Sequence, residues 1–121
     1  MAEKRMFSMK VVDSDEFLEL PASAQNLYFH LSMRADDDGF VGNPRTVARI
    51  IGATEEDLRA LTDSGFILTF GGRVVAIRHW RIHNSLRREY YIPTRYLMQL
   101  ETLSVLPDGS YTERPADGGT K

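Results

Sequence analysis

The stretch of sequence that decides the fold is residues 43–80, NPRTVARIIGATEEDLRALTDSGFILTFGGRVVAIRHW. Asn43 followed by Pro44 is typical of a helix start, because asparagine caps helices and proline suits the first helical position. That helix is expected to end at the glycine after its paired isoleucines, and Thr54 with Asp57 indicates a capping-box start for a second helix. Two short helices joined by a tight, glycine-containing turn form the helix-turn-helix pattern.

Two strands are predicted directly after the second helix. Residues 66–70, FILTF, and the run from Arg73 to Trp80 are rich in β-branched and aromatic residues, and a Gly-Gly pair separates them. Such a pair between two strand-like runs predicts a β-hairpin. We expect Trp80 to be buried and to anchor this hairpin against the preceding long helix, near Leu27 or Leu31.

Outward toward the N-terminus, the pattern predicts a long helix. It opens at Pro21 and Ser23 and runs to about Ala35, with apolar side chains at helical spacing. The other elements in this half are short: a strand-like entry over residues 6–12, a helical turn over residues 14–20, and Phe40 and Val41, which could add to a sheet.

Toward the C-terminus, the pattern predicts a further helix and then a tail. Pro93 and Thr94 begin a helix that runs to about Leu106. Residues 107–121 are rich in glycine, proline and polar residues, which indicates a disordered tail or a linker. The order of elements predicts an α+β fold, mainly α. It is a winged helix-turn-helix domain over residues 1–106, with a short β-hairpin wing and a C-terminal helix.

Composition excludes several classes of protein. The 121 residues are 42% hydrophobic and 26% charged, which fits a soluble globular domain. The chain has no cysteine, which excludes disulfide scaffolds and thiolate metal sites and fits a cytoplasmic location. No apolar run approaches the roughly 20 residues needed to span a bilayer, so no membrane partner is expected.

No group of residues indicates catalysis, a cofactor or a metal. His79 and His83 are four residues apart, but the first falls in a predicted strand and no cysteine or acidic motif accompanies them. The three aspartates before Gly39 lack the alternate spacing of a calcium loop, and a phosphate-binding glycine loop is absent. We therefore expect a protein that is not an enzyme, with no cofactor and no metal site.

Positive charge is concentrated in one part of the chain. The formal net charge is −2, yet residues 73–100 hold six arginines and one acid, Glu89. Aromatic residues lie between the arginines, and this combination suits phosphate contact with base stacking. The predicted nucleic-acid-binding residues are Arg73, Arg78, Arg81, Arg87, Arg88 and Arg95, interleaved with Trp80, Tyr90, Tyr91 and Tyr96. The alternative is that the aromatics are core residues and that the arginines pair with the acidic first half.

The second helix of the helix-turn-helix is acidic. It reads TEEDLRALTDSG from Thr54 and has Arg59 as its single base. Such a helix is unfavourable beside phosphates, because binding depends on cationic contacts that release counterions. We therefore favour a structural or protein-contact role for it over direct reading of bases, and expect any nucleic-acid contact to run through the arginine-rich stretch.

Two runs make the sequence resemble a known family. They are SAQNLYFHLSMRADDDGFV, residues 23–41, and the pair HWRIHN and PTRY, residues 79–84 and 93–96. Over about residues 4–100 the chain resembles the N-terminal domain of DnaD-like phage replisome organizers of Gram-positive hosts. The resemblance implies a winged-helix domain that acts in replication initiation by binding DNA or partner proteins to help load a helicase. The family usually carries a second, C-terminal domain, whose functions are not expected of this sequence.

The predicted function is a DNA-binding and replisome-assembly module in phage or prophage replication. Its expected partners are DNA, held non-specifically by its phosphates, and replication proteins such as a helicase or its loader. The alternatives are a protein-interaction and oligomerisation domain without DNA binding, and a winged-helix transcriptional regulator. Apolar residues near both ends predict a homo-oligomer, most simply a dimer: Met6, Phe7, Met9, Leu97, Leu100, Leu103 and Leu106.

Overall fold

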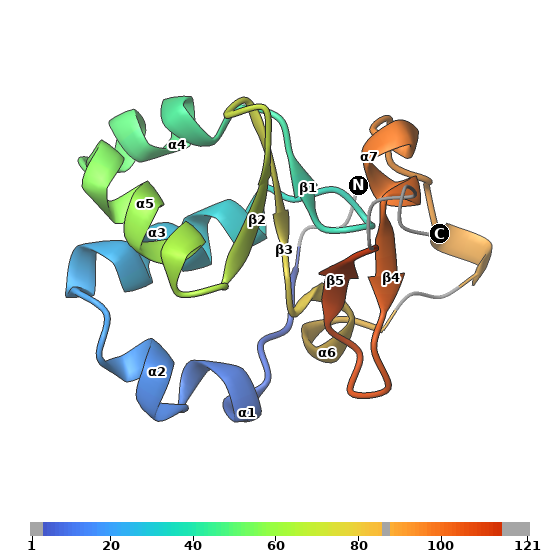
Figure 1. Ribbon diagram of the computed structural model, residues 1–121, viewed down its shortest axis with the longest axis horizontal. Helices are drawn as coiled ribbons and strands as arrows, with labels where there is room; N and C mark the ends of the chain where they lie inside the picture. The colour runs from blue at the N-terminus through green and yellow to red at the C-terminus, as the bar shows by residue number, and fades with distance from the viewer. Residues whose placement is uncertain (1–3, 86–87, 115–121) are drawn as a thin grey trace.

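The computed structural model describes residues 4–85 and 88–114, and it has the α+β architecture that the sequence predicted (Figure 1). The α-helices in this part of the chain are α1 (Met9–Val12), α2 (Asp15–Leu18), α3 (Ala22–Met33), α4 (Pro44–Ile51), α5 (Glu55–Asp63), α6 (Trp80–His83) and α7 (Leu97–Glu101), and one 3-10 turn spans Arg88–Tyr90. The strands are β1 (Phe40–Val41), β2 (Ile67–Phe70), β3 (Val74–Ile77), β4 (Leu103–Val105) and β5 (Tyr111–Glu113). Within the described residues, no helix is long and apolar enough to cross a membrane.

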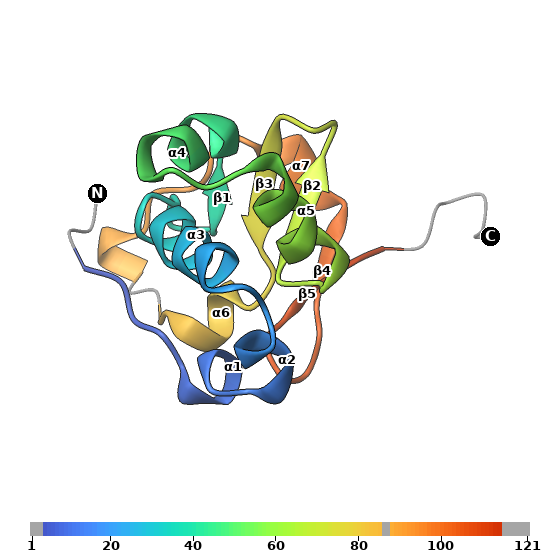
Figure 2. The ribbon, with the colours of Figure 1, turned by 90° about the vertical axis from the view of Figure 1, so that its left-hand side faces the viewer.

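The centre of the structure is a three-stranded antiparallel sheet of order β1-β3-β2. Helices α3, α4 and α5 cover one side of it, and the β4–β5 hairpin lies on the other side (Figures 1 and 2). Phe40 pairs with Ala76, so the two-residue strand does add to the sheet as the sequence suggested. The core between the layers is built from large side chains that are almost fully buried, including Phe17, Leu31 and Leu61.

The two helices of the predicted helix-turn-helix are confirmed. Helix α4 begins at Pro44 and is followed by Gly52 in the left-handed conformation, with φ +78°. Helix α5 begins after Thr54, whose hydroxyl accepts from the Asp57 N–H while the Asp57 carboxylate accepts from the Thr54 N–H. This reciprocal capping box satisfies two backbone donors at once, which explains why the start was readable from sequence.

The hairpin is confirmed, but its second strand is shorter than predicted. Phe70 pairs with Val74, so the connection holds three residues and includes Arg73 as well as the two glycines. Strand β3 ends at Ile77, and Trp80 starts helix α6 instead of ending a strand. The Trp80 side chain is fully buried in the core, and its Nε1 donates to the Asp37 carbonyl oxygen at 2.9 Å.

The burial of Trp80 confirms one sequence prediction. The contacts the structure shows for the indole are with the Arg5 guanidinium, 4.9 Å from the ring centroid, and with Asp37. Its expected packing near Leu27 or Leu31 stays a prediction.

The N-terminal segment differs from its predicted strand-like entry over residues 6–12. Residues 9–12 form α1, which starts at Ser8 because the Ser8 hydroxyl accepts from the Lys10 N–H. The preceding residues instead run along the core: the Met6 N–H donates to the Asn84 side chain and the Ser8 N–H donates to the His83 ring. The helical turn expected over residues 14–20 is confirmed as α2, capped by Ser14.

The C-terminal segment differs most from the sequence prediction. The helix expected from residue 93 to about Leu106 is only the short α7, and the chain then enters β4. Part of the predicted tail over residues 107–121 is strand β5, which pairs with β4. Tyr111 holds this hairpin in place, because it is 1% exposed, its N–H donates to the Arg78 carbonyl and its hydroxyl donates to the Asp38 carbonyl. Residues 115–121 lie outside the described part of the chain.

Candidate nucleic-acid interface

The structure spreads the sequence-predicted arginines over several places. Arg73 lies in the exposed turn between β2 and β3. Arg78 follows the other end of β3, and Arg81 lies in α6. Five residues of extended chain separate Arg73 from Arg78, roughly 16 Å. Arg95 precedes α7 in the segment that returns to the loop of residues 36–38. Arg88 lies in the 3-10 turn, and Arg87 lies outside the described residues.

Arg81 interacts with residues distant in sequence, and Arg95 with its neighbour in the chain. The Arg81 Nη2 lies 3.9 Å from Oδ1 of Asp38, whose carboxylate is fully buried, and the Arg81 guanidinium lies 6.0 Å from the Tyr111 ring centroid. The Arg95 guanidinium lies 5.7 Å from the ring centroid of Tyr96. The ion pair between Arg81 and Asp38 agrees with the alternative, in which the arginines pair with the acidic first half.

The interleaved aromatic residues do not form a stacking platform. Trp80 is buried, and the Tyr91 hydroxyl donates to Asp38 Oδ2 at 2.6 Å, with burial and then this bond raising its pKa. Tyr96 stacks on Phe40, with ring centroids 6.1 Å apart. Tyr90 alone among the four is largely exposed, at 72%. Of these four aromatic residues, Tyr90 is therefore the one whose ring is accessible for stacking on a base.

The three aspartates before Gly39 form a structural loop. Asp36 Oδ1 accepts from the backbone N–H groups of Asp38 and Phe40, and its Oδ2 accepts from the Thr94 hydroxyl at 2.5 Å. Asp38 Oδ2 accepts from the Thr94 N–H as well as from the tyrosine described above. The loop therefore fastens residues 91–96 to the end of α3. Within residues 4–85 and 88–114, no three histidine or acidic side chains are grouped so that they could hold a metal ion.

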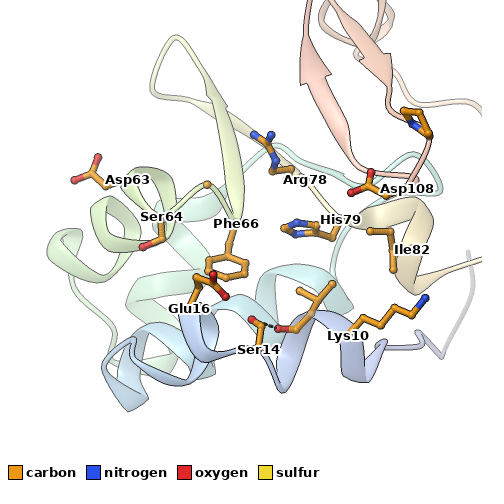
Figure 3. Close-up of a pocket in the computed structure, with 13 residues that line it drawn as sticks. Lys10, Ser14, Glu16, Asp63, Ser64, Phe66, Arg78, His79, Ile82 and Asp108 are labelled. Carbon is orange, nitrogen blue, oxygen red and sulfur yellow. Dashed lines mark hydrogen bonds between the residues drawn. The ribbon is translucent and has the colours of Figure 1, made fainter.

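A wide bowl of about 810 Å³ lies where α1, the start of α2, the end of α5, the base of the β2–β3 hairpin and the β4–β5 turn meet (Figure 3). Phe66 and His79 lie at its centre, and Arg78 and Lys10 face it together with the acids Glu16, Asp63 and Asp108. Burial and the neighbouring Arg78 lower the pKa of His79. Because acids outnumber bases on its walls, the bowl does not suit a polyanion.

Two acidic side chains of α5, Asp57 and Glu55, make structural contacts at its N-terminus. Burial alone would raise the pKa of Asp57, but hydrogen bonds from Thr54 and from the Ser23 hydroxyl, at 2.7 Å, lower it overall. Glu55 forms a two-oxygen contact with Arg45 of α4, with the Arg45 Nη2 2.7 Å from Glu55 Oε2. This supports the structural role that the sequence favoured for these acids.

A second cationic surface was missed by sequence reasoning. Arg45 and Arg49 are exposed on α4, and a groove of about 230 Å³ between α4 and α5 is lined by both. A second groove, of about 260 Å³, runs between α5 and the β2–β3 hairpin and is lined by Arg45 and Arg59. Arg45 Nη1 also donates to the carbonyl oxygen of Gly72, directly before Arg73. Arg45, Arg49 and Arg59 line these grooves and Arg73 follows Gly72 of the second one; we call these four residues the groove arginines.

A partial signal for this surface is present in the sequence. Arg45 and Arg49 are four residues apart in the predicted helix, which places them on one face. Arg59 belongs to the next helix and Arg73 to the turn of the hairpin, so their approach to that face depends on how the elements pack.

Comparisons with known proteins give no match. No protein-family model matches the sequence, and no curated protein does. No solved structure matches the fold.

Proposed function

We propose that this chain is a winged helix-turn-helix module that binds DNA through its phosphates during phage or prophage replication initiation. The winged-helix assignment is supported by the element order α3, β1, α4, α5, β2, β3 and by the sheet order β1-β3-β2. The role in replication is supported by the resemblance of residues 23–41, 79–84 and 93–96 to replisome organizers.

The observation that carries the proposal is the position of the groove arginines. Helix α5 and the turn of the β2–β3 hairpin are the elements with which a winged-helix domain meets DNA, and all four groove arginines lie on α4, on α5 or in that turn. Guanidinium groups suit bidentate contact with phosphate. Glu55 and Glu56 stand on the first turn of α5, so the surface favours phosphate contact over the reading of bases.

A fluorescence-anisotropy titration with single- and double-stranded oligonucleotides at several salt concentrations tests this proposal. Arg49→Ala/Arg73→Ala should weaken binding to all sequences alike and reduce the salt slope by roughly two units, because each lost phosphate contact removes about one. The matched variant is Arg87→Ala/Arg88→Ala, in the arginine-rich stretch, which should change the slope less.

The two variants separate the two candidate surfaces. If Arg87→Ala/Arg88→Ala abolishes binding while Arg49→Ala/Arg73→Ala does not, the interface is the arginine-rich stretch and not the groove arginines. If the parent protein does not bind at low salt, DNA binding by this chain is refuted. Strong preference for one operator-like site would instead support a transcriptional regulator.

A second candidate function is a protein-interaction and oligomerisation domain that does not bind DNA. Apolar side chains in the C-terminal segment favour it, because large exposed apolar residues are typical of interaction surfaces. Those exposed by more than a third are Tyr90, Ile92, Leu97, Met98, Val105 and Leu106. Replication proteins such as a helicase or its loader, or a second copy of the chain, are the proposed partners of this surface.

A further inference from the structure

Arg45 stands where three elements meet. Its guanidinium extends from the first turn of α4 to Glu55 on the first turn of α5 and to the carbonyl of Gly72 in the β2–β3 turn. Its Nε lies 3.0 Å from Glu55 Oε1 and 3.1 Å from Oε2, and its Nη2 lies 2.7 Å from Oε2. Both side chains are about half exposed, at 54% and 52%. The pair is therefore accessible to a ligand from solution.

We propose that Arg45 is a phosphate-binding residue whose site is occupied in the free protein by the Glu55 carboxylate. The inference rests on the proposed function, because the incoming ligand is a phosphodiester of the DNA backbone. The guanidinium fork that holds two carboxylate oxygens has the geometry to hold two phosphate oxygens. Binding of DNA then exchanges one anion for another on the same cation.

The surroundings of Arg45 suit such an exchange. An exposed ion pair contributes little net free energy, so a phosphate can displace the carboxylate. The bond from Nη1 to the Gly72 carbonyl does not involve Glu55, so it continues to position the guanidinium after the exchange. A glutamate carboxylate is ionised at neutral pH, so Glu55 competes for the guanidinium there, and the hydrogen bond from Arg45 lowers its pKa further.

Glu56 provides a matched control inside the chain. It is the next residue, it is exposed, and it carries the same charge on the same turn of α5. The hydrogen bonds of Arg45 go to Glu55 and to Gly72, not to Glu56. General repulsion between α5 and phosphates is therefore removed about equally by Glu55→Gln and by Glu56→Gln, whereas only Glu55→Gln frees Arg45. Neither change touches the capping box of Thr54 and Asp57.

The experiment compares the affinities of the parent, Glu55→Gln, Glu56→Gln, Arg45→Gln and the Arg45→Gln/Glu55→Gln double variant for a short fluorescein-labelled DNA duplex at low salt. Thermal unfolding of each variant confirms that it is folded. Glu55→Gln should bind about 2- to 5-fold more tightly than Glu56→Gln, the range expected for freeing one exposed ion pair. In the Arg45→Gln background, Glu55→Gln should lose this extra gain.

The outcomes distinguish the exchange from the proposed function. If the parent binds but Glu55→Gln and Glu56→Gln tighten binding equally, DNA binding stands and the exchange at Arg45 is refuted. An extra gain that persists without Arg45 also refutes it. If none of the variants binds the duplex, both the exchange and the DNA-binding function are refuted.

Discussion

His83 is a buried imidazole with both ring nitrogens engaged. Its Nδ1 accepts from the Ser8 N–H at 2.8 Å, and its Nε2 lies 2.6 Å from the Tyr28 hydroxyl. Because Nδ1 accepts a hydrogen bond, the neutral ring must carry its proton on Nε2, which donates to the tyrosine oxygen. Burial and the neighbouring His79 lower the pKa of His83 to about 4. Protonation would place a positive charge on a ring that is shielded from water. It would also turn Nδ1 into a donor that faces the Ser8 N–H, which is itself a donor.

Acidification should therefore destabilise the protein through His83. Between the unfolded pKa of 6.5 and the folded pKa of about 4, the unfolded chain holds a proton that the folded chain does not. The free energy of unfolding then rises with pH across this window and falls as pH drops. From pH 7 to pH 5 the loss from His83 should be about 1–2 kcal/mol.

Urea unfolding at several pH values measures this loss. His83→Gln should lower stability at pH 7, but its stability should fall less between pH 7 and pH 5 than that of the parent. His79→Gln is the companion variant, because His79 has a lowered pKa but no hydrogen bond to the core tyrosine. An unchanged pH dependence in His83→Gln would show that folding does not lower the pKa of His83.

Gly39 is a position where both backbone and space require glycine. Its φ is +90°, and a Cβ there would lie 2.6 Å from Cγ of Trp80. Gly39→Ala should lower the free energy of unfolding by about 2–4 kcal/mol, from backbone strain and from displacement of the indole. Gly52→Ala is the control, since its φ is +78° but nothing lies within 4 Å of the added Cβ, and it should lose only about 1 kcal/mol. Equal losses in denaturant unfolding would mean that the indole moves freely aside.

At the scale of elements, the β4–β5 hairpin depends on contacts distant in sequence. The hydroxyl of Tyr111 donates to the Asp38 carbonyl at 2.8 Å inside the protein. Tyr111→Phe should therefore lower the free energy of unfolding by about 1–2 kcal/mol, because a buried acceptor loses its donor. Tyr90→Phe, at a ring that is 72% exposed, should change it by less than about 0.5 kcal/mol. Thermal unfolding followed by circular dichroism compares the two, and equal effects would contradict the anchoring role of Tyr111.

The elements that sequence predicted well carry their signals locally. Helix α5 has a capping box within four residues, and the β2–β3 turn contains Gly71 and Gly72, both at positive φ. Strand β4 was predicted as the end of a helix, and β5 was predicted as part of a tail because the glycine and proline content of residues 107–121 resembles a linker. The anchors of this hairpin lie at Asp38 and Arg78. Such anchors become visible only when the chain is folded.

The candidate site was only partly predictable for the same reason. Arg73 was expected to contact nucleic acid, and it follows Gly72, which lines the groove between α5 and the hairpin. The acidic helix α5 was expected to have a structural or protein-contact role, and Asp57 does cap it. Arg45 and Glu55 are ten residues apart on separate helices, and no sequence pattern predicts that they pair. The sequence prediction followed the density of arginines along the chain and therefore named residues 73–100. The groove arginines instead come from α4, α5 and the β2–β3 turn.

At the scale of the whole molecule, exposed apolar side chains lie toward both ends of the described chain. Met6 and Met9 are 55% and 68% exposed, and Leu97 and Met98 are 53% and 80% exposed. Of the other residues on which self-association was predicted, Leu103 is buried, Phe7 and Leu100 are partly buried, and Leu106 is 39% exposed. The surface left for an interface is therefore smaller than the sequence suggested and is concentrated near α7.

We expect the protein to form a dimer through this surface near α7. Leu97→Lys/Met98→Lys should weaken the dimer at least tenfold, because a lysine ammonium buried against an apolar partner surface loses its hydration without gaining a counter-charge. Met9→Lys, on α1, is the control and should leave the dimer intact. Light scattering at tens of micromolar protein measures the mass of each. A monomer mass for the parent would refute the prediction of self-association. If Met9→Lys breaks the dimer and Leu97→Lys/Met98→Lys does not, the interface lies at the N-terminal helices instead.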